Sequence, residues 1–294
     1  MNNVSNPSRI VAFGDSYAAD YSVEAERLRN DDPTIYEQMV KFHLAKGNME
    51  TFSTYCWVNM LSDMLGVNDV AFYSKIGTSI QFTMVKLFEY IISDYDQNDI
   101  IIVCLTDPTR SPIVNDDCSW FHICASMLSS YAIHRLKEMV AEPGSFQDNL
   151  KQGIAFHEQY HLGLAVDGGY STDVYCLTDY LMSLPNTVVV LGTTDEIKNT
   201  KYDSLCLKNC NNKFFIRDTL IDVNLNEFSI SGGKRLTKSD YFKQAGGYDL
   251  RFNHLSYENH VKLAEMVGSC ILHGDVSEFD VTRFTKNILN GKLQ

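Results

Sequence analysis

Five short segments rich in apolar residues recur along the chain and end at turn or polar residues. They lie at residues 10–13, 69–74, 99–106, 187–192 and 214–223. Apolar runs of this length, without the strict polar alternation of a half-exposed strand, are typical of strands buried on both faces. The pattern therefore predicts five strands within a sheet, of which 99–106 is the clearest.

Between these segments, apolar residues recur at helical spacing. The predicted helices lie at residues 35–45, 55–65, 80–93, 118–163 (in two pieces), 172–184 and 256–272. In the helix at 80–93, the expected apolar stripe consists of Phe82, Val85, Phe88 and Ile92. The last twenty residues are polar, and we expect a tail or a covering helix there.

Strands that alternate with helices indicate a mostly parallel sheet with helices on both faces. No clear linker, internal repeat or low-complexity segment divides the chain, so we expect a single α/β domain over residues 1–294. Two stretches, at about 21–50 and about 113–165, have the character of insertions into this domain.

The charge balance narrows the range of partners. The formal net charge is −12, whereas a nucleic-acid or anionic-membrane partner requires a basic surface. No basic region followed by an apolar segment begins the sequence, and no run is long enough to span a bilayer. We therefore expect a cytoplasmic protein whose eight cysteines are reduced and mostly buried. The oligomeric state stays open.

Polar residues and glycine follow three of the predicted strands at their carboxyl ends. Asp15 and Ser16 follow the first strand, Gly77 the second, and Thr106 and Asp107 the third. Because the carboxyl ends of parallel strands share one edge of a sheet, the three turns are expected to meet in one crevice. A serine on such a turn is suited to be a nucleophile, although a Gly-Asp-Ser turn can also serve simply as a helix cap.

A histidine near the C-terminus completes the candidate group. His254 lies just before the last predicted helix, which Asn253 or Ser256 would cap. A loop histidine at a helix start can reach across the edge of a sheet. His260 lies inside the helix and is expected to be structural.

With these residues in place, the chain resembles the SGNH or GDSL hydrolases. That superfamily has a Gly-Asp-Ser block near the N-terminus, a glycine after the second strand, an asparagine block after the third, and Asp-x-x-His before the C-terminal helix. Gly14-Asp15-Ser16, Gly77 and His254 match three of these blocks, and the resemblance spans most of the chain. It implies a flavodoxin-like three-layer sandwich with a mostly parallel central sheet and helical insertions, and an enzyme without a cofactor.

The third block departs from the family pattern. Thr106 and Asp107 stand where the family has the asparagine of its oxyanion hole. A carboxylate at Asp107, if it faced the hole, would repel the developing negative charge. Thr106 and Arg110 are the replacement donors that we consider, unless Asp107 points away.

The last block departs as well. Arg251 occupies the position, three residues before His254, at which the family has an aspartate. Asp249 is the nearest acidic residue and Asp240 a more distant one. A Ser16–His254 dyad is therefore expected, and it becomes a triad if Asp249 orients the histidine.

The resemblance implies an esterase or deacetylase that acts on a small acyl ester, including one carried on a carbohydrate. Ser16 would attack the ester carbonyl, and His254 would take its proton and return it to the leaving group. The backbone N–H groups of Ser16 and Gly77 would hold the oxyanion. The alternative is a catalytically degenerate member that uses the crevice for binding or serves as a structural component.

A second motif suggests different chemistry. Residues 157–161 read His-Glu-Gln-Tyr-His, and on a helix this spacing places His157 and His161 on one side, where they can bind zinc with Glu158 as general base. A catalytic zinc needs a third protein ligand, for which Asp167 is a candidate, but the glycine of that pattern is absent. An amphipathic helix explains the spacing more simply, so a zinc peptidase is a second alternative.

Overall fold

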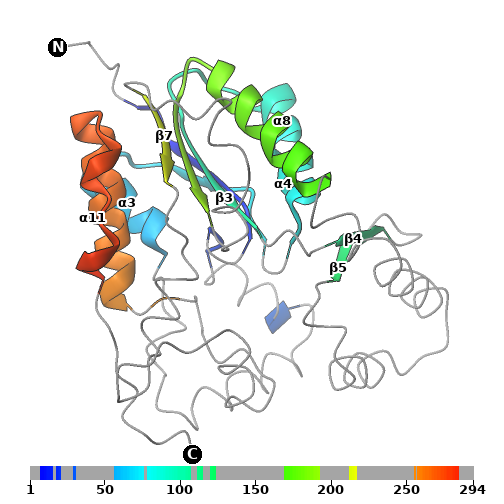
Figure 1. Ribbon diagram of the computed structural model, residues 1–294, viewed down its shortest axis with the longest axis horizontal. Helices are drawn as coiled ribbons and strands as arrows, with labels where there is room; N and C mark the ends of the chain where they lie inside the picture. The colour runs from blue at the N-terminus through cyan, green and yellow to red at the C-terminus, as the bar shows by residue number, and fades with distance from the viewer. Residues whose placement is uncertain are drawn as a thin grey trace, which may run out of the picture.

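The computed structural model describes residues 7–15, 18–20, 29–30, 56–75, 78–106, 111–114, 120–123, 169–192, 212–216, 255 and 257–284. Within these residues the central sheet consists of β1 (Ile10–Phe13), β2 (Val70–Phe72), β3 (Ile100–Leu105), β6 (Thr187–Gly192) and β7 (Lys213–Ile216). The flanking helices are α3 (Trp57–Leu65), α4 (Ile80–Ser93), α8 (Gly169–Ser183) and α11 (Tyr257–His273) (Figure 1).

The sheet is parallel throughout, with the order β2-β1-β3-β6-β7. Numbered along the chain, this order is 2-1-3-4-5, the flavodoxin-like arrangement. The expected α/β fold with a mostly parallel central sheet is therefore confirmed. The chain reverses its direction of growth between β1 and β3, and such a reversal leaves a crevice at the carboxyl ends of these two strands.

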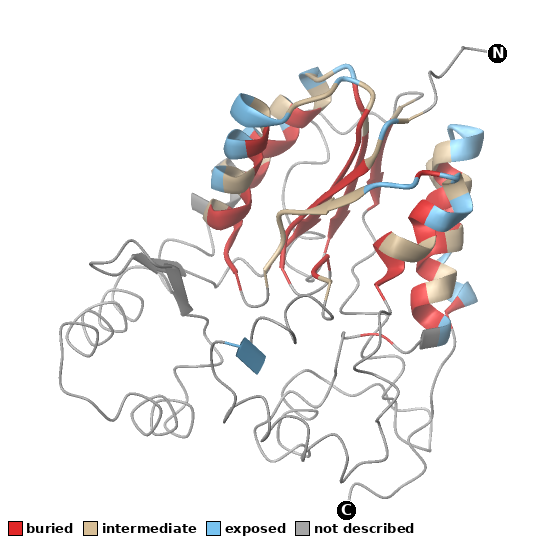
Figure 2. Cartoon of the chain, turned by 180° about the vertical axis from the view of Figure 1, so that it is seen from behind, coloured by how far each residue is buried: buried red, intermediate tan, exposed pale blue. Residues whose placement is uncertain are grey.

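Two helical layers cover the sheet, α3 and α11 on one face and α4 and α8 on the other (Figure 1). Alternate residues of each strand face opposite layers: in β1, Ile10 and Ala12 pack toward α3 and α11, whereas Val11 and Phe13 pack toward α4 and α8. Figure 2 shows the buried strands between the buried sides of the helices. The burial of both strand faces explains why the strands read as apolar runs without polar alternation.

The buried face of α4 differs from the predicted stripe. Phe82 is buried, but Val85, Phe88 and Ile92 are 36%, 47% and 85% exposed, so this prediction was wrong for three of its four residues. The buried side chains of α4 are those of Ile80, Phe82, Thr83, Leu87 and Tyr90. Apolar residues occur on most sides of this helix, so their spacing does not fix its orientation.

Tyr90 shows what orients α4 instead. Its ring contacts that of Phe13 on the sheet, with the centroids 5.6 Å apart, and its hydroxyl donates to Asp99 Oδ2 at 2.8 Å. The side of α4 that carries Tyr90 therefore faces the sheet, and Ile92 faces solvent.

The segment predicted as helical at 118–163 contains a strand. β5 (Trp120–Ile123) pairs antiparallel with β4 (Ser111–Val114), in a two-stranded sheet separate from the central one. The sequence Trp-Phe-His-Ile favours strand, because aromatic and β-branched residues suit a pleated surface, and a short apolar run is ambiguous by periodicity alone. The predicted helix at 35–45 and the rest of 118–163 lie outside the described residues.

Residues 275–284, the described half of the last twenty, pack against the core. After α11, two short 3-10 turns, η6 (Val276–Glu278) and η7 (Val281–Arg283), carry Phe279 and Phe284 into the core beside α3 and α11. The two rings lie 6.2 Å apart between centroids. Phe279 and Phe284, together with the partly buried Val276 and Val281, thus join this segment to the core.

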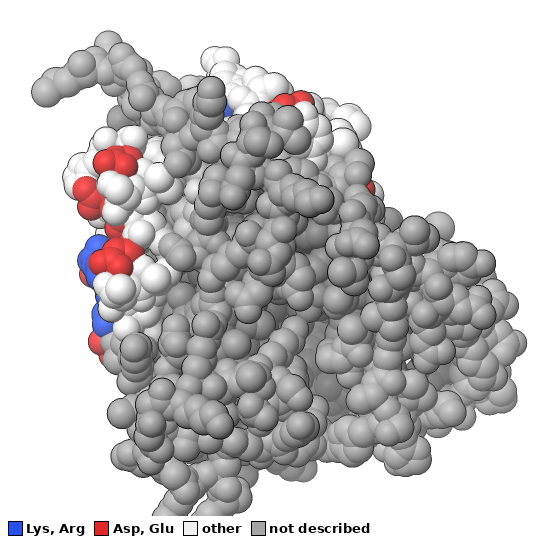
Figure 3. All heavy atoms as spheres, viewed as in Figure 1, with Lys and Arg blue, Asp and Glu red and all other residues white. Residues whose placement is uncertain are grey.

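Acidic and basic side chains lie intermingled on the α11 side of the molecule (Figure 3). Lys262 Nζ lies 2.9 Å from Glu258 Oε1, and Arg283 Nη2 lies 3.5 Å from Glu265 Oε2. Among the described residues, no helix is both long enough and apolar enough to cross a membrane.

Candidate functional site at the carboxyl edge of the sheet

Gly14 directly follows β1 and lies tightly against the backbone of β3. Its φ is +133°, and a Cβ atom at this position would lie 2.5 Å from the carbonyl oxygen of Cys104. Both the backbone conformation and the close approach exclude a side chain. Glycine therefore lets the first strand turn directly against the third at the start of the Gly-Asp-Ser block.

Asp15 is buried beneath the turn that follows Gly14, with 1% of its surface exposed. The hydroxyl of Thr106, at the end of β3, lies 3.0 Å from Asp15 Oδ2. The carbonyl oxygen of Asp15 accepts hydrogen bonds from the backbone N–H groups of Ala18 and Ala19, both at 3.0 Å. Asp15 is thus held by main-chain bonds to residues 18 and 19 and by a side-chain bond to the end of β3.

A second anchor lies in the loop after β2. The Thr78 hydroxyl lies 2.9 Å from the carbonyl oxygen of Lys75 and 3.2 Å from that of Gly14, and the Lys75 N–H donates to the Gly14 carbonyl at 3.2 Å. Ser79 then caps α4, where its hydroxyl accepts from the N–H of Phe82 at 3.4 Å. Lys75 and Thr78 are therefore both tied to the end of β1.

Thr106 joins these two segments. Its side chain is buried, and its hydroxyl lies 2.8 Å from the carbonyl oxygen of Thr78 as well as 3.0 Å from Asp15 Oδ2. The sequence named Thr106 as a replacement oxyanion donor; the structure turns its hydroxyl inward to these two acceptors.

The other sequence-predicted site residues lie outside the described part of the chain and stay predictions. They are Ser16, Gly77, Asp107, Arg110, Asp249 and His254, together with His157 and His161 of the zinc alternative. The structure describes residues adjacent to several of them in the chain. Leu255, which follows His254, is buried in the core layer of α3 and α11. Figure 1 shows α11 beginning on the side of the sheet toward which the strands point.

The sequence did not single out Asp15 and Thr78 for roles of their own. The signal that marks them is a polar residue immediately beside a buried strand end or helix start, where an unpaired polar group would be costly. Asp15, Thr78 and Thr106 all satisfy this description and are all buried. Polar residues at these positions are thus candidates for buried hydrogen-bond anchors.

The thiols near this edge are unsuited to nucleophilic attack. Burial raises the pKa of the Cys104 thiol well above its usual range, and the negative charge of Asp15 raises it further. Burial also raises the pKa of Cys56 to about 12. Because the thiolate is the reactive form, neither cysteine competes with a serine nucleophile at neutral pH. Among the described residues, no group of three or more metal-binding side chains comes together.

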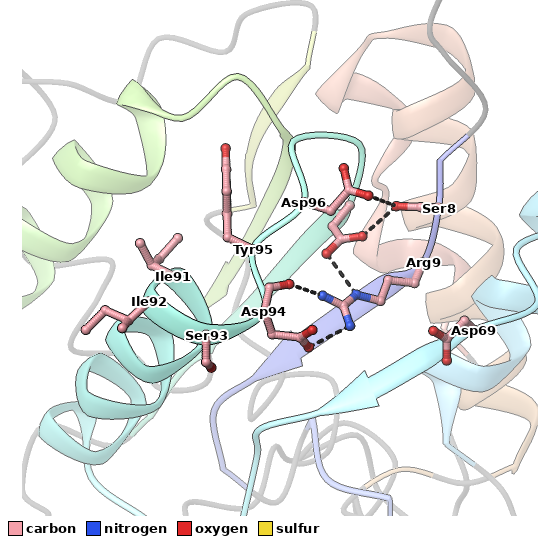
Figure 4. A pocket seen from close by; sticks show the side chains of 10 residues that line it. Ser8, Arg9, Asp69, Ile91, Ile92, Ser93, Asp94, Tyr95 and Asp96 are labelled. Atoms are coloured by element: carbon pink, nitrogen blue, oxygen red, sulfur yellow. Dashed lines mark hydrogen bonds and ion pairs between the residues drawn. The ribbon is translucent and has the colours of Figure 1, made fainter.

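A hollow of about 700 Å³ lies at the opposite, amino edge of the sheet (Figure 4). There Arg9 Nε donates to Asp99 Oδ2 at 2.8 Å, and Arg9 Nη1 donates to Asp94 Oδ2 at 2.7 Å. Asp99 is fully buried and also accepts from the hydroxyls of Ser8, at 2.7 Å, and Tyr90, at 2.8 Å. The cluster thus joins the start of β1 to the start of β3 and the end of α4.

The electrostatics of this hollow indicate that its charged residues stabilise the fold. Hydrogen bonding to Arg9 lowers the pKa of Asp94, and burial, reinforced by the bond to Asp99, raises the pKa of Tyr90. The guanidinium of Arg9 is committed to two carboxylates and lies 5.6 Å from the centroid of the Tyr90 ring. We therefore place the candidate functional site at the carboxyl edge.

Comparison with known proteins adds no relative: the chain matches no protein-family model, no curated protein and no solved structure. The functional argument therefore rests on the residues and geometry of this chain.

Proposed function

We propose that this chain is a serine ester hydrolase of the SGNH type, with Ser16 as the nucleophile and His254 as its general base. The observation that supports the proposal is the anchored Gly14-Asp15 segment, which lies at the end of β1 where the strand order reverses and directly precedes Ser16 in the sequence. A buried carboxylate and a close-packed glycine are more than a helix cap requires, and they support the catalytic interpretation of the block.

The proposed reaction is acyl transfer through a covalent intermediate. Ser16 Oγ attacks the carbonyl carbon of a small ester while His254 takes the hydroxyl proton. The tetrahedral intermediate expels the alcohol, which receives the proton from His254. Water, activated by the same histidine, then releases the acid and restores the serine. The substrate class is a small acyl ester, including an acyl group carried on a carbohydrate.

The proposed oxyanion hole consists of the backbone N–H groups of Ser16 and Gly77. Main-chain donors suit this chain, because the family asparagine is replaced and the Thr106 hydroxyl points to Asp15 and Thr78. Arg110 is a further candidate donor, and Asp249 is proposed to orient His254. Losing one oxyanion donor typically lowers turnover about 100- to 1,000-fold, so this replacement predicts a slow enzyme.

The test is labelling with a fluorophosphonate probe followed by peptide mapping. We expect one adduct, on Ser16, that is absent from Ser16→Ala and strongly reduced in His254→Ala. Ser74→Ala is a matched control at another serine near this edge, whose hydroxyl donates to the Ala18 carbonyl at 3.0 Å. A folded protein that takes no label would contradict the proposal.

The same experiment decides the alternative of a degenerate, ligand-binding member. Asp107 in place of the family asparagine favours this alternative, because a carboxylate facing the crevice would oppose an oxyanion. In that case the folded protein stays unlabelled, and Asp107→Asn does not restore labelling. Labelling that appears in Asp107→Asn would instead show that Ser16 and His254 are competent and that the carboxylate suppresses them.

A further inference from the structure

One hydroxyl group bridges the two segments that lead to the proposed oxyanion hole. Asp15 immediately precedes Ser16, and Thr78 immediately follows Gly77. The hydroxyl of Thr106 lies within 3.0 Å of an acceptor on each segment, namely Asp15 Oδ2 and the Thr78 carbonyl oxygen.

The bridge is backed by further bonds on both sides. Thr78 donates to the carbonyl oxygen of Gly14, and the carbonyl oxygen of Asp15 accepts the N–H groups of Ala18 and Ala19. Asp15, Thr78 and Thr106 are buried, so water is not at hand to replace a lost bond. A buried polar group that loses its partner bears the desolvation cost, which the backbone can relieve only by moving.

We infer that Thr106 is a positioning residue: it sets the separation between the backbone N–H groups of Ser16 and Gly77 by holding Asp15 and Thr78 at a fixed distance. This inference rests on the proposed function. Thr106 does not touch the substrate, because its hydroxyl faces inward. Thr106 stands where the family has an asparagine that donates to the oxyanion. Here the main-chain N–H groups donate to the oxyanion, and Thr106 aligns them.

The consequence concerns the rate of the chemical step more than substrate binding. Oxyanion donors act on charge that develops in the transition state, so a misplaced pair of N–H groups lowers the maximal rate. A displacement of about 1 Å in such a group costs about 100-fold. Removing the Thr106 hydroxyl is expected to displace the two segments by less than about 1 Å.

The experiment compares Thr106→Val, which keeps the shape and removes the hydroxyl, with Thr106→Ser, which keeps the hydroxyl. Thr178→Val is the matched control, because Thr178 is also buried and donates to a carbonyl oxygen, that of Val174, at 2.7 Å within α8. The readouts are the maximal rate and half-saturation of fluorophosphonate labelling, and kcat and KM for p-nitrophenyl acetate.

We expect Thr106→Val to lower the maximal labelling rate and kcat by about 10- to 100-fold, with half-saturation and KM changed less than about threefold. Thr106→Ser should retain at least about a third of the wild-type rate, and Thr178→Val should match the wild type. Asp15→Ala, which removes the acceptor, should also lower kcat, and the double variant with Thr106→Val should be no slower than the slower single variant, because both changes remove the same bond.

The outcomes separate the two proposals. A wild-type protein that takes no label on Ser16 removes the proposed function, and the inference with it. A labelled wild type with Thr106→Val at the same rate overturns the inference alone. Equal slowing in Thr106→Val and Thr106→Ser also overturns it, since the hydroxyl would then not matter. If Thr106→Val does not fold, Asp15→Ala decides: an unchanged rate rejects the bridge, and a rate loss with KM preserved supports it.

Discussion

Among the described glycines, Gly14 has the least room for an added methyl group. Its φ of +133° and the 2.5 Å approach of a Cβ to the Cys104 carbonyl oxygen predict that Gly14→Ala lowers the free energy of unfolding by at least about 2 kcal/mol. Gly66→Ala is the control, because Gly66 has φ +66° with nothing within 4 Å, and should cost about 1 kcal/mol. Urea unfolding of the two variants measures the difference; equal losses would contradict the close approach.

Cysteine reactivity gives a second prediction at this scale. Burial raises the pKa of Cys270 to about 11 from an ordinary value of 9.0, so its thiolate fraction at pH 8 is about 100-fold below that of an ordinary thiol. Cys56 is buried with a pKa of about 12, whereas Cys176 is exposed. Iodoacetamide at pH 8 should therefore modify Cys176 long before Cys56 and Cys270. Peptide mapping over time would refute this if Cys270 reacted as fast as Cys176.

At the scale of elements, α4 can be tested for which side it buries. Leu87 is 1% exposed and Ile92 is 85% exposed, although both carry the same number of carbon atoms. We expect Leu87→Ala to cost about 2–5 kcal/mol and Ile92→Ala less than about 0.5 kcal/mol. Denaturant unfolding compares the pair directly. Similar costs for both substitutions would restore the stripe read from the sequence and contradict the orientation set by Tyr90.

The whole molecule should lose stability on the acid side. Hydrogen bonding to Arg9 lowers the pKa of Asp94, and the N–H of Asn98 lowers that of Asp96. A carboxyl whose pKa is depressed in the folded state stabilises the fold above its unfolded pKa, near 3.8, and this stability is lost as the pH falls through the folded pKa. We therefore expect the Tm to begin to fall as the pH drops below about 4.

Asp94→Asn is the matched variant for this pH dependence. It removes the charge and leaves the shape, so its Tm should lie below that of the wild type at pH 7 and approach it at pH 3. Thermal unfolding followed by circular dichroism provides both curves. A difference between wild type and Asp94→Asn that persists unchanged at pH 3 would show that the carboxylate charge is not the cause.

Local sequence patterns predicted the bounds of an element correctly wherever one interaction, such as full burial or a helix cap, sets those bounds. The strands at 10–13 and 187–192 and the helix at 80–93 have the bounds expected from sequence, because full burial demands unbroken apolar runs and Ser79 provides a helix cap. The sheet direction followed from the alternation of strands and helices. The candidate edge also followed, since Thr106 comes directly after such a run and Asp15 follows another after one glycine.

The sequence by itself thus determined the α/β class, the parallel sheet and the proximity of the turns after β1, β2 and β3, because these depend on periodicity and on the geometry of parallel strands. Only the tertiary structure decided which side of α4 is buried, that Phe279 and Phe284 enter the core, and that Thr106 bonds to Asp15 and Thr78. These features depend on contacts between residues far apart in the chain, and no local pattern records which partner a side chain will meet.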